Sequence, residues 1–152
     1  MPGPSGPSDP SGPSDRAAPT DFASRCDTIE GAYEFFLAYA SQGLLSDQGS
    51  EKGREVREYL GRCDGALTGI GGLIMGFVER AGLDPAPYRR FADVIERDAR
   101  DASAAIRLVL AQPAIGSQLV DNLNASIHLR ALLTDLFLID EALKLHGTHG
   151  PD

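Results

Sequence analysis

Apolar residues recur every three or four positions along most of this chain, which is the spacing of one face of an α-helix. The first such segment covers residues 20–42, and others follow at 51–81, 85–111 and 114–145. No segment shows the strict alternation of apolar and polar residues that is typical of a half-buried strand. The pattern therefore predicts an all-α protein with four helices. The apolar stripe of the first is Phe22, Cys26, Ile29, Tyr33, Phe36 and Ala40, and that of the fourth is Val120, Leu123, Ile127, Ala131, Thr134, Leu138, Ala142 and Leu145.

The predicted helix ends coincide with residues that stop or start helices. Gly43 and Gly82 are suited to the residue just after a helix. Asp84 can cap the third helix, and Pro85 fits its first position. Four helices joined by short loops are expected to lie antiparallel. The sequence thus predicts an up-and-down antiparallel four-helix bundle, with crossing angles of about +20°.

Composition divides the chain into three parts. Residues 1–19 are rich in proline, glycine and serine and contain little apolar surface, so we expect a disordered N-terminal arm. Residues 20–146 form the predicted bundle. Residues 147–152 are expected to be a flexible tail.

The overall charge limits the classes of partner. The formal net charge is -8 and the isoelectric point is about 4.8, whereas nucleic-acid binders normally carry a basic patch. There is no run of 18 apolar residues, so a membrane span is not expected. The N-terminus lacks the order of charges and apolar residues of a signal peptide, which indicates a cytoplasmic protein. Arginine greatly outnumbers lysine, a bias typical of GC-rich bacterial genomes.

The predicted second helix contains a row of glycines at helical spacing, although glycine is a poor helix former. We expect the row to allow close packing against another helix, above all at Gly69 and Gly72. Two alternatives are a groove that admits a ligand and a helix that is kinked or partly unwound here. The row consists of Gly61, Gly65, Gly69, Gly72 and Gly76.

The predicted fourth helix is apolar on more than one side. A helix of this kind is either central in a fold or covered by another chain on its second face. Because every helix of a four-helix bundle has an outer side, we expect self-association as a homodimer. The interface candidates lie outside the apolar stripe and are Leu132, Leu136, Phe137, Ile139 and Leu143.

Candidate chemistry is sparse. Cys26 and Cys63 lie in apolar stripes, where a free cysteine packs as a small hydrophobic residue. His128 shares a polar flank with Asp121, Asn124 and Asp135, but the spacings of common metal motifs are missing. No catalytic residue, metal site or cofactor is therefore assigned. The candidates for ligand binding are Phe35, Tyr39, Gly69, Gly72 and His128.

These features favour a non-enzymatic helical interaction module that self-associates and acts as an adaptor or regulator through protein partners. The alternative is a small-molecule-binding protein, or an enzyme, that uses a hydrophobic cavity inside the bundle.

Overall fold

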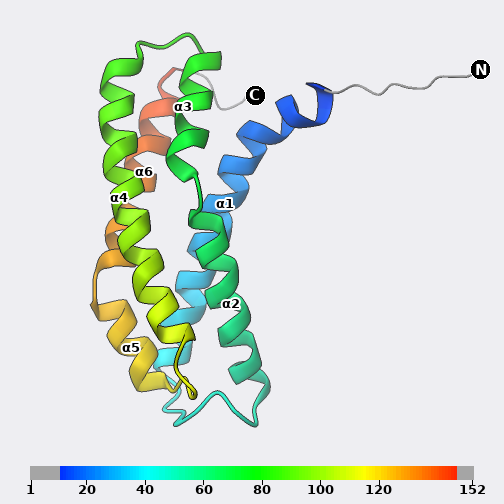
Figure 1. Ribbon diagram of the computed structural model, residues 1–152, viewed down its shortest axis with the longest axis vertical. Helices are drawn as coiled ribbons and strands as arrows, with labels where there is room; N and C mark the ends of the chain where they lie inside the picture. The colour runs from blue at the N-terminus through cyan, green and yellow to red at the C-terminus, as the bar shows by residue number, and fades with distance from the viewer. Residues whose placement is uncertain (1–10, 147–152) are drawn as a thin grey trace, which may run out of the picture.

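The computed structural model describes residues 11–146, with side chains from residue 22 onward (Figure 1). This part of the chain is all-helical and contains no strand, which confirms the predicted class but with six helices instead of four. The helices are α1 (Ser11–Ala40), α2 (Glu51–Leu67), α3 (Ile70–Arg80), α4 (Pro85–Leu110), α5 (Ser117–Ala125) and α6 (His128–Lys144).

The two longest helices, α1 and α4, organise the fold. Each of them contacts α2, α3, α5 and α6 (Figure 1). The α2 and α3 segments follow one another along one side of the molecule, and α5 and α6 follow one another along another side. The core therefore lies between α1 and α4, and the two interrupted helical pairs enclose it.

Helix α1 begins earlier than predicted. Its helical backbone starts at Ser11, whereas the sequence predicted the first helix from residue 20. Arg16, Ala17 and Ala18 are good helix formers, and Pro13 lies in the first turn, where a missing backbone N–H costs little. The other predicted arm residues, 1–10, and the tail, 147–152, lie outside the described residues.

The apolar stripes of the first three predicted helices form the core. Phe36, Leu60, Ile74 and Ile106 are fully buried. At the start of α4, Asp84 accepts a hydrogen bond from the backbone N–H of Ala86 at 3.3 Å, as its predicted capping role requires. These predictions are confirmed because the helices are amphipathic, and burial of their apolar faces drives the packing.

The predicted second helix is interrupted at Gly69. This residue has a φ of 69°, in the left-handed region, and separates α2 from α3. Glycine adopts this conformation without the steric cost that a Cβ adds. Of the interpretations of the glycine row, the kinked segment is therefore correct at Gly69. The prediction of close packing at Gly69 and Gly72 is wrong, because a Cβ built at either position would have no atom within 4 Å.

The predicted fourth helix is interrupted at Ile127, the one described non-glycine residue with a positive φ, at 67°. The break changes which side of the next helix meets the core. Before it, Val120 and Leu123 are buried as predicted. After it, the predicted stripe turns outward, and Leu138 and Leu145 are exposed.

Candidate functional site

The side of α6 that faces away from the core carries large apolar residues. We call it the outer face of α6. Ile127 is 53% exposed, Leu138 is 60% exposed and Leu145 is 82% exposed. Leu138 lies within α6, whereas Ile127 and Leu145 are the residues that cap its two ends. The outer face comprises Ile127, Arg130, Thr134, Leu138, Glu141 and Leu145, all of them exposed.

The interface residues that the sequence predicts are mostly on the opposite side of α6. Leu132, Leu136, Ile139 and Leu143 are at most 3% exposed within the single chain. They therefore belong to the core and cannot form the exposed surface that we expected. Phe137 alone of the five candidates is exposed, at 55%. The side of α6 that was predicted to be exposed is therefore the side that packs in the core.

The aromatic candidates Phe35 and Tyr39 pack tightly. The Phe35 ring stacks on that of Tyr59 with 4.3 Å between centroids, and its centroid is 6.0 Å from that of Tyr39. The Tyr39 hydroxyl donates to the backbone oxygen of Ile115 at 2.8 Å, and the side chain is fully buried. These residues join α1 to α2 and to the loop before α5.

The remaining ligand candidates lie apart from one another. Gly69 lines a cavity of about 250 Å³ together with Asp64, Glu96 and other residues of α2 and α4. Gly72 lines a separate groove of about 460 Å³ between α3 and the start of α4. His128 is exposed at the start of α6. The five predicted ligand-binding residues therefore do not converge on one site.

Close approach of two helices occurs at Gly71, which the predicted row does not include. The Gly71 N–H donates to Glu96 Oε2 at 2.7 Å. A Cβ on Gly71 would lie 2.5 Å from Glu96 Cγ and 3.1 Å from the backbone oxygen of Ala92. Glu96 thus satisfies one of the free N–H groups at the start of α3 and fixes this helix against α4.

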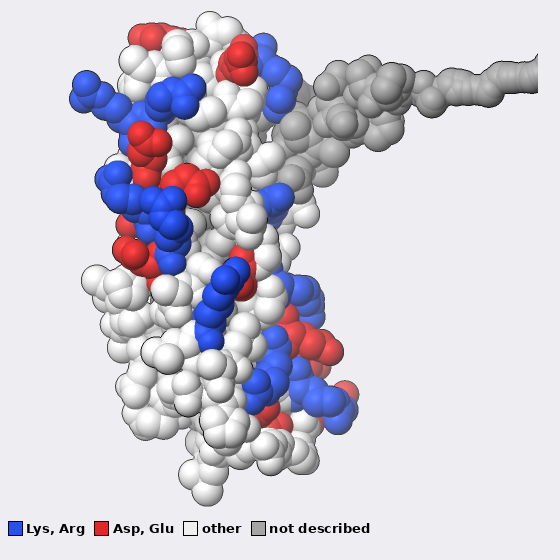
Figure 2. Space-filling view, viewed as in Figure 1, with Lys and Arg blue, Asp and Glu red and all other residues white. Residues whose placement is uncertain are grey.

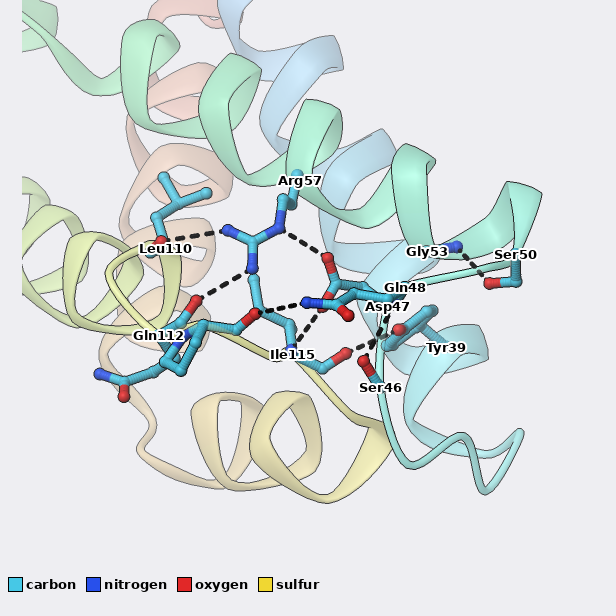
Figure 3. Close-up of polar contacts among 11 residues, drawn as sticks. Tyr39, Ser46, Asp47, Gln48, Ser50, Gly53, Arg57, Leu110, Gln112 and Ile115 are labelled. Carbon is cyan, nitrogen blue, oxygen red and sulfur yellow. Dashed lines mark hydrogen bonds and ion pairs between the residues drawn. The ribbon is translucent and has the colours of Figure 1, made fainter.

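An ion pair between the buried Asp47 and the partly buried Arg57 holds the loops together at the end of the molecule where α4 ends (Figure 3). Asp47 accepts hydrogen bonds from Arg57 Nε and from the backbone N–H of Ile115, both at 2.6 Å. Arg57 also donates to the backbone oxygens of Leu110 at 3.2 Å and Gln112 at 2.9 Å. One guanidinium therefore binds a carboxylate and the carbonyls that end α4.

This cluster is structural, because its polar groups satisfy one another. Burial alone would raise the pKa of Asp47, but the hydrogen bonds from Arg57 and Ile115 outweigh it and hold the pKa below its usual value. Two glycines allow the loops to approach. A Cβ on Gly53 would overlap the Asp47 carbonyl, and one on Gly116 would lie 2.8 Å from the backbone oxygen of Leu45.

Two carboxyl groups meet where α4 packs on α6. Asp135 Oδ2 is inaccessible to solvent and receives no hydrogen bond from the described residues, and its neighbour is the carboxyl group of Asp98, with which it could share one. Two carboxyl groups can share such a bond only when one of them is protonated. Burial, this hydrogen bond and the charge of Asp98 raise the pKa of Asp135 to about 7.

The remaining reactive groups of the described residues are the two cysteines and the polar residues near His128 in the sequence. Burial, with nearby acidic residues, raises the pKa of both Cys26 and Cys63 to about 12, so neither thiol is a ready nucleophile. Asn124 is buried in α5 and donates to the backbone oxygen of Phe36 at 3.3 Å, away from the exposed His128. In the described part of the chain, no group of three or more His, Cys, Asp or Glu side chains could hold a metal ion.

The charged surface is mixed. Figure 2 shows blue and red groups close together along the first half of α4 and around α2, and an uncharged area over α5. None of the helices within residues 11–146 is long and apolar enough to cross a membrane. Comparison of the chain with protein-family models, curated proteins and solved structures found no match.

Proposed function

We propose that the chain is a non-enzymatic helical interaction module that self-associates and acts through protein partners as an adaptor or regulator. In this proposal the six helices form one antiparallel bundle, in which α2 with α3 and α5 with α6 each replace one continuous helix. A cytoplasmic location and a bacterial origin are parts of the same proposal.

The outer face of α6 is the observation that carries the proposal. Its opposite side is packed in the core, where Leu132 and Leu136 are almost fully buried. The fold therefore does not need apolar residues on the outer face, yet Leu138 and Leu145 are there. Large exposed apolar residues on one side of a helix are a feature of surfaces that bind another protein.

Light scattering coupled to size-exclusion chromatography, with the protein at micromolar concentration, tests self-association. Burying one leucine is worth about 1.5–3 kcal/mol, and a symmetric dimer would contain two copies of Leu138. We therefore expect Leu138→Asp to weaken self-association about a hundredfold or more. Leu108→Asp is the matched control, because Leu108 is 66% exposed but lies on α4. A wild-type protein that stays monomeric would show that self-association is wrong.

The groove between α3 and α4 favours a second function, the binding of a small apolar molecule. Its volume of about 460 Å³ lies within the usual range for such sites. Met75 and Leu83 supply apolar walls, and Arg89 supplies a cation. Gly72 has no side chain to fill the groove, and the space where its Cβ would lie has no other atom within 4 Å.

Native mass spectrometry of the purified protein tests this second function. A bound ligand should appear as added mass on the wild-type chain and be lost in Gly72→Leu, while thermal unfolding of the variant shows that the fold is kept. If no ligand accompanies the wild-type chain and apolar probes do not bind, the groove has no such role.

A further inference from the structure

The outer face of α6 has an order of residues that is nearly symmetric about position 136. Read inward from its two ends, Ile127 corresponds to Leu145, and Thr134 corresponds to Leu138. Between these pairs, Arg130 lies six residues before position 136 and Glu141 lies five residues after it. The face is therefore apolar at both ends and has one cation and one anion in corresponding places.

This order matters because a two-fold interface sets one surface against a second copy of itself. In an antiparallel pair of α6 helices, the apolar ends of one copy meet the apolar ends of the other. Arg130 of each copy then lies beside Glu141 of its partner copy. In a parallel pair, arginine would face arginine and glutamate would face glutamate, and like charges at flanking positions disfavour pairing.

We infer that two copies of this chain associate through the outer face of α6 in an antiparallel, two-fold arrangement in which Arg130 of one copy pairs with Glu141 of the other. The inference rests on the proposed function and adds the partner and its orientation. Within one chain, Glu141 lies 3.9 Å from Lys144 in an exposed ion pair. Such pairs contribute little, so this contact does not compete strongly with Arg130 of a second copy.

Charge exchange tests the pairing. Arg130→Glu and Glu141→Arg should each weaken the dimer about tenfold, because each change replaces two attractive pairs with two repulsive ones. The double variant Arg130→Glu/Glu141→Arg should restore the wild-type dissociation constant, measured by sedimentation equilibrium. Arg90→Glu is the matched control: Arg90 is an exposed arginine of α4, so this variant changes the net charge equally but leaves α6 intact.

A spin label at Lys144→Cys tests the orientation. In the antiparallel pair the two labelled positions are separated by about 16 residues of helix, or about 24 Å, whereas in a parallel pair they lie about 10 Å apart. The introduced thiol is exposed, and the label is placed in a Cys26→Ala/Cys63→Ala background so that it reacts at this position alone. Electron paramagnetic resonance then measures the distance between the labels.

The outcomes separate this inference from the proposed function. Restoration by the double charge exchange, with the longer distance between labels, supports the antiparallel pair. A wild-type dimer without restoration, or with the shorter distance, would overturn the antiparallel pair and leave self-association standing. A monomeric wild-type chain would overturn both.

Discussion

Gly71 and Gly72 are neighbours in the first turn of α3, yet alanine should have opposite effects on stability at the two positions. At Gly71 a Cβ would lie 2.5 Å from Glu96 Cγ, 2.9 Å from Glu96 Oε2 and 3.1 Å from the backbone oxygen of Ala92. At Gly72 no atom would lie within 4 Å, and the residue is exposed. The two substitutions therefore compare a helix contact with open solvent in the same helical turn.

The expected magnitudes follow from the atoms that must move. Alanine gains up to about 1 kcal/mol over glycine within a helix. Nothing opposes this gain at Gly72, so the free energy of unfolding should rise by about 0.4–1 kcal/mol. At Gly71 the Glu96 side chain must move and give up its hydrogen bond to the Gly71 N–H, which is worth about 1.5–3 kcal/mol for a charged acceptor. Contact with the α4 backbone adds about 1–3 kcal/mol of overpacking, so the net loss, after the gain from alanine is subtracted, should be about 1.5–5.5 kcal/mol.

Urea unfolding followed by far-UV circular dichroism measures both changes. The same pair of substitutions in a Glu96→Ala background is the control, because Gly71→Ala should cost less once the Glu96 side chain has gone. Stabilisation by Gly71→Ala equal to that by Gly72→Ala would refute the close contact between α3 and α4.

Two further predictions concern α6. The pKa of Asp135, raised to about 7, lies above its unfolded value, so the ionised form is disfavoured in the folded state and stability should fall as the pH rises from about 4 to about 7. Asp135→Asn should remove this fall in stability. At a pH of about 8 the variant should be more stable than the wild type by about 1–2 kcal/mol, a value kept small because Asp135 is partly exposed and solvent screens its charge. Stability–pH curves of the same slope for the two proteins would contradict this prediction. Ile127→Asn should raise the free energy of unfolding by about 0.5–1 kcal/mol, because asparagine tolerates a positive φ better than isoleucine. The same variant should weaken self-association, and an unchanged dissociation constant would argue against a role of Ile127 in the interface.

The sequence predicts the class of fold and three of its buried faces well. The apolar residues of α1, α2 and α4 repeat at helical spacing, and charged residues occupy the other sides of these helices. For such helices the direction of the core is a local property, as fully buried Ile29, Leu60 and Ile95 show. The buried face of such a helix can therefore be predicted without knowing which distant residues pack against it.

The buried face of the fourth predicted helix was predicted wrongly, because this segment has two apolar faces and either could pack in the core. The continuous stripe includes Ala131 and Thr134, which bury little apolar surface, whereas the alternative face is rich in leucine. Burying the richer face removes more apolar area from water. The left-handed residue at Ile127 makes this possible by changing the direction of the chain between α5 and α6. A comparison of the hydrophobicity of the two faces would have identified the buried one, whereas the spacing of apolar residues alone did not.

The polar clusters could not be predicted from one sequence. Asp47 lies in one loop and Ile115 in another, and they are bonded across 68 positions of the chain. Asp98 and Asp135 are similarly placed on different helices. Neither pair has a local spacing that indicates a contact. Their partners are set by tertiary packing, which also explains why Gly71, and not the predicted glycines, is the point of close approach.

Ile127 departs from two local preferences at once, and the packing of the single chain explains the turn of the backbone but not the choice of isoleucine there. A β-branched residue in the left-handed region is strained, whereas glycine or asparagine would be accommodated there. The side chain is also half-exposed, so its burial within the chain does not offset this strain. Strained residues cluster at functional sites, and violations of local preference are expected there. A partner helix on the outer face of α6 would cover the Ile127 side chain and supply the apolar contact that the single chain lacks.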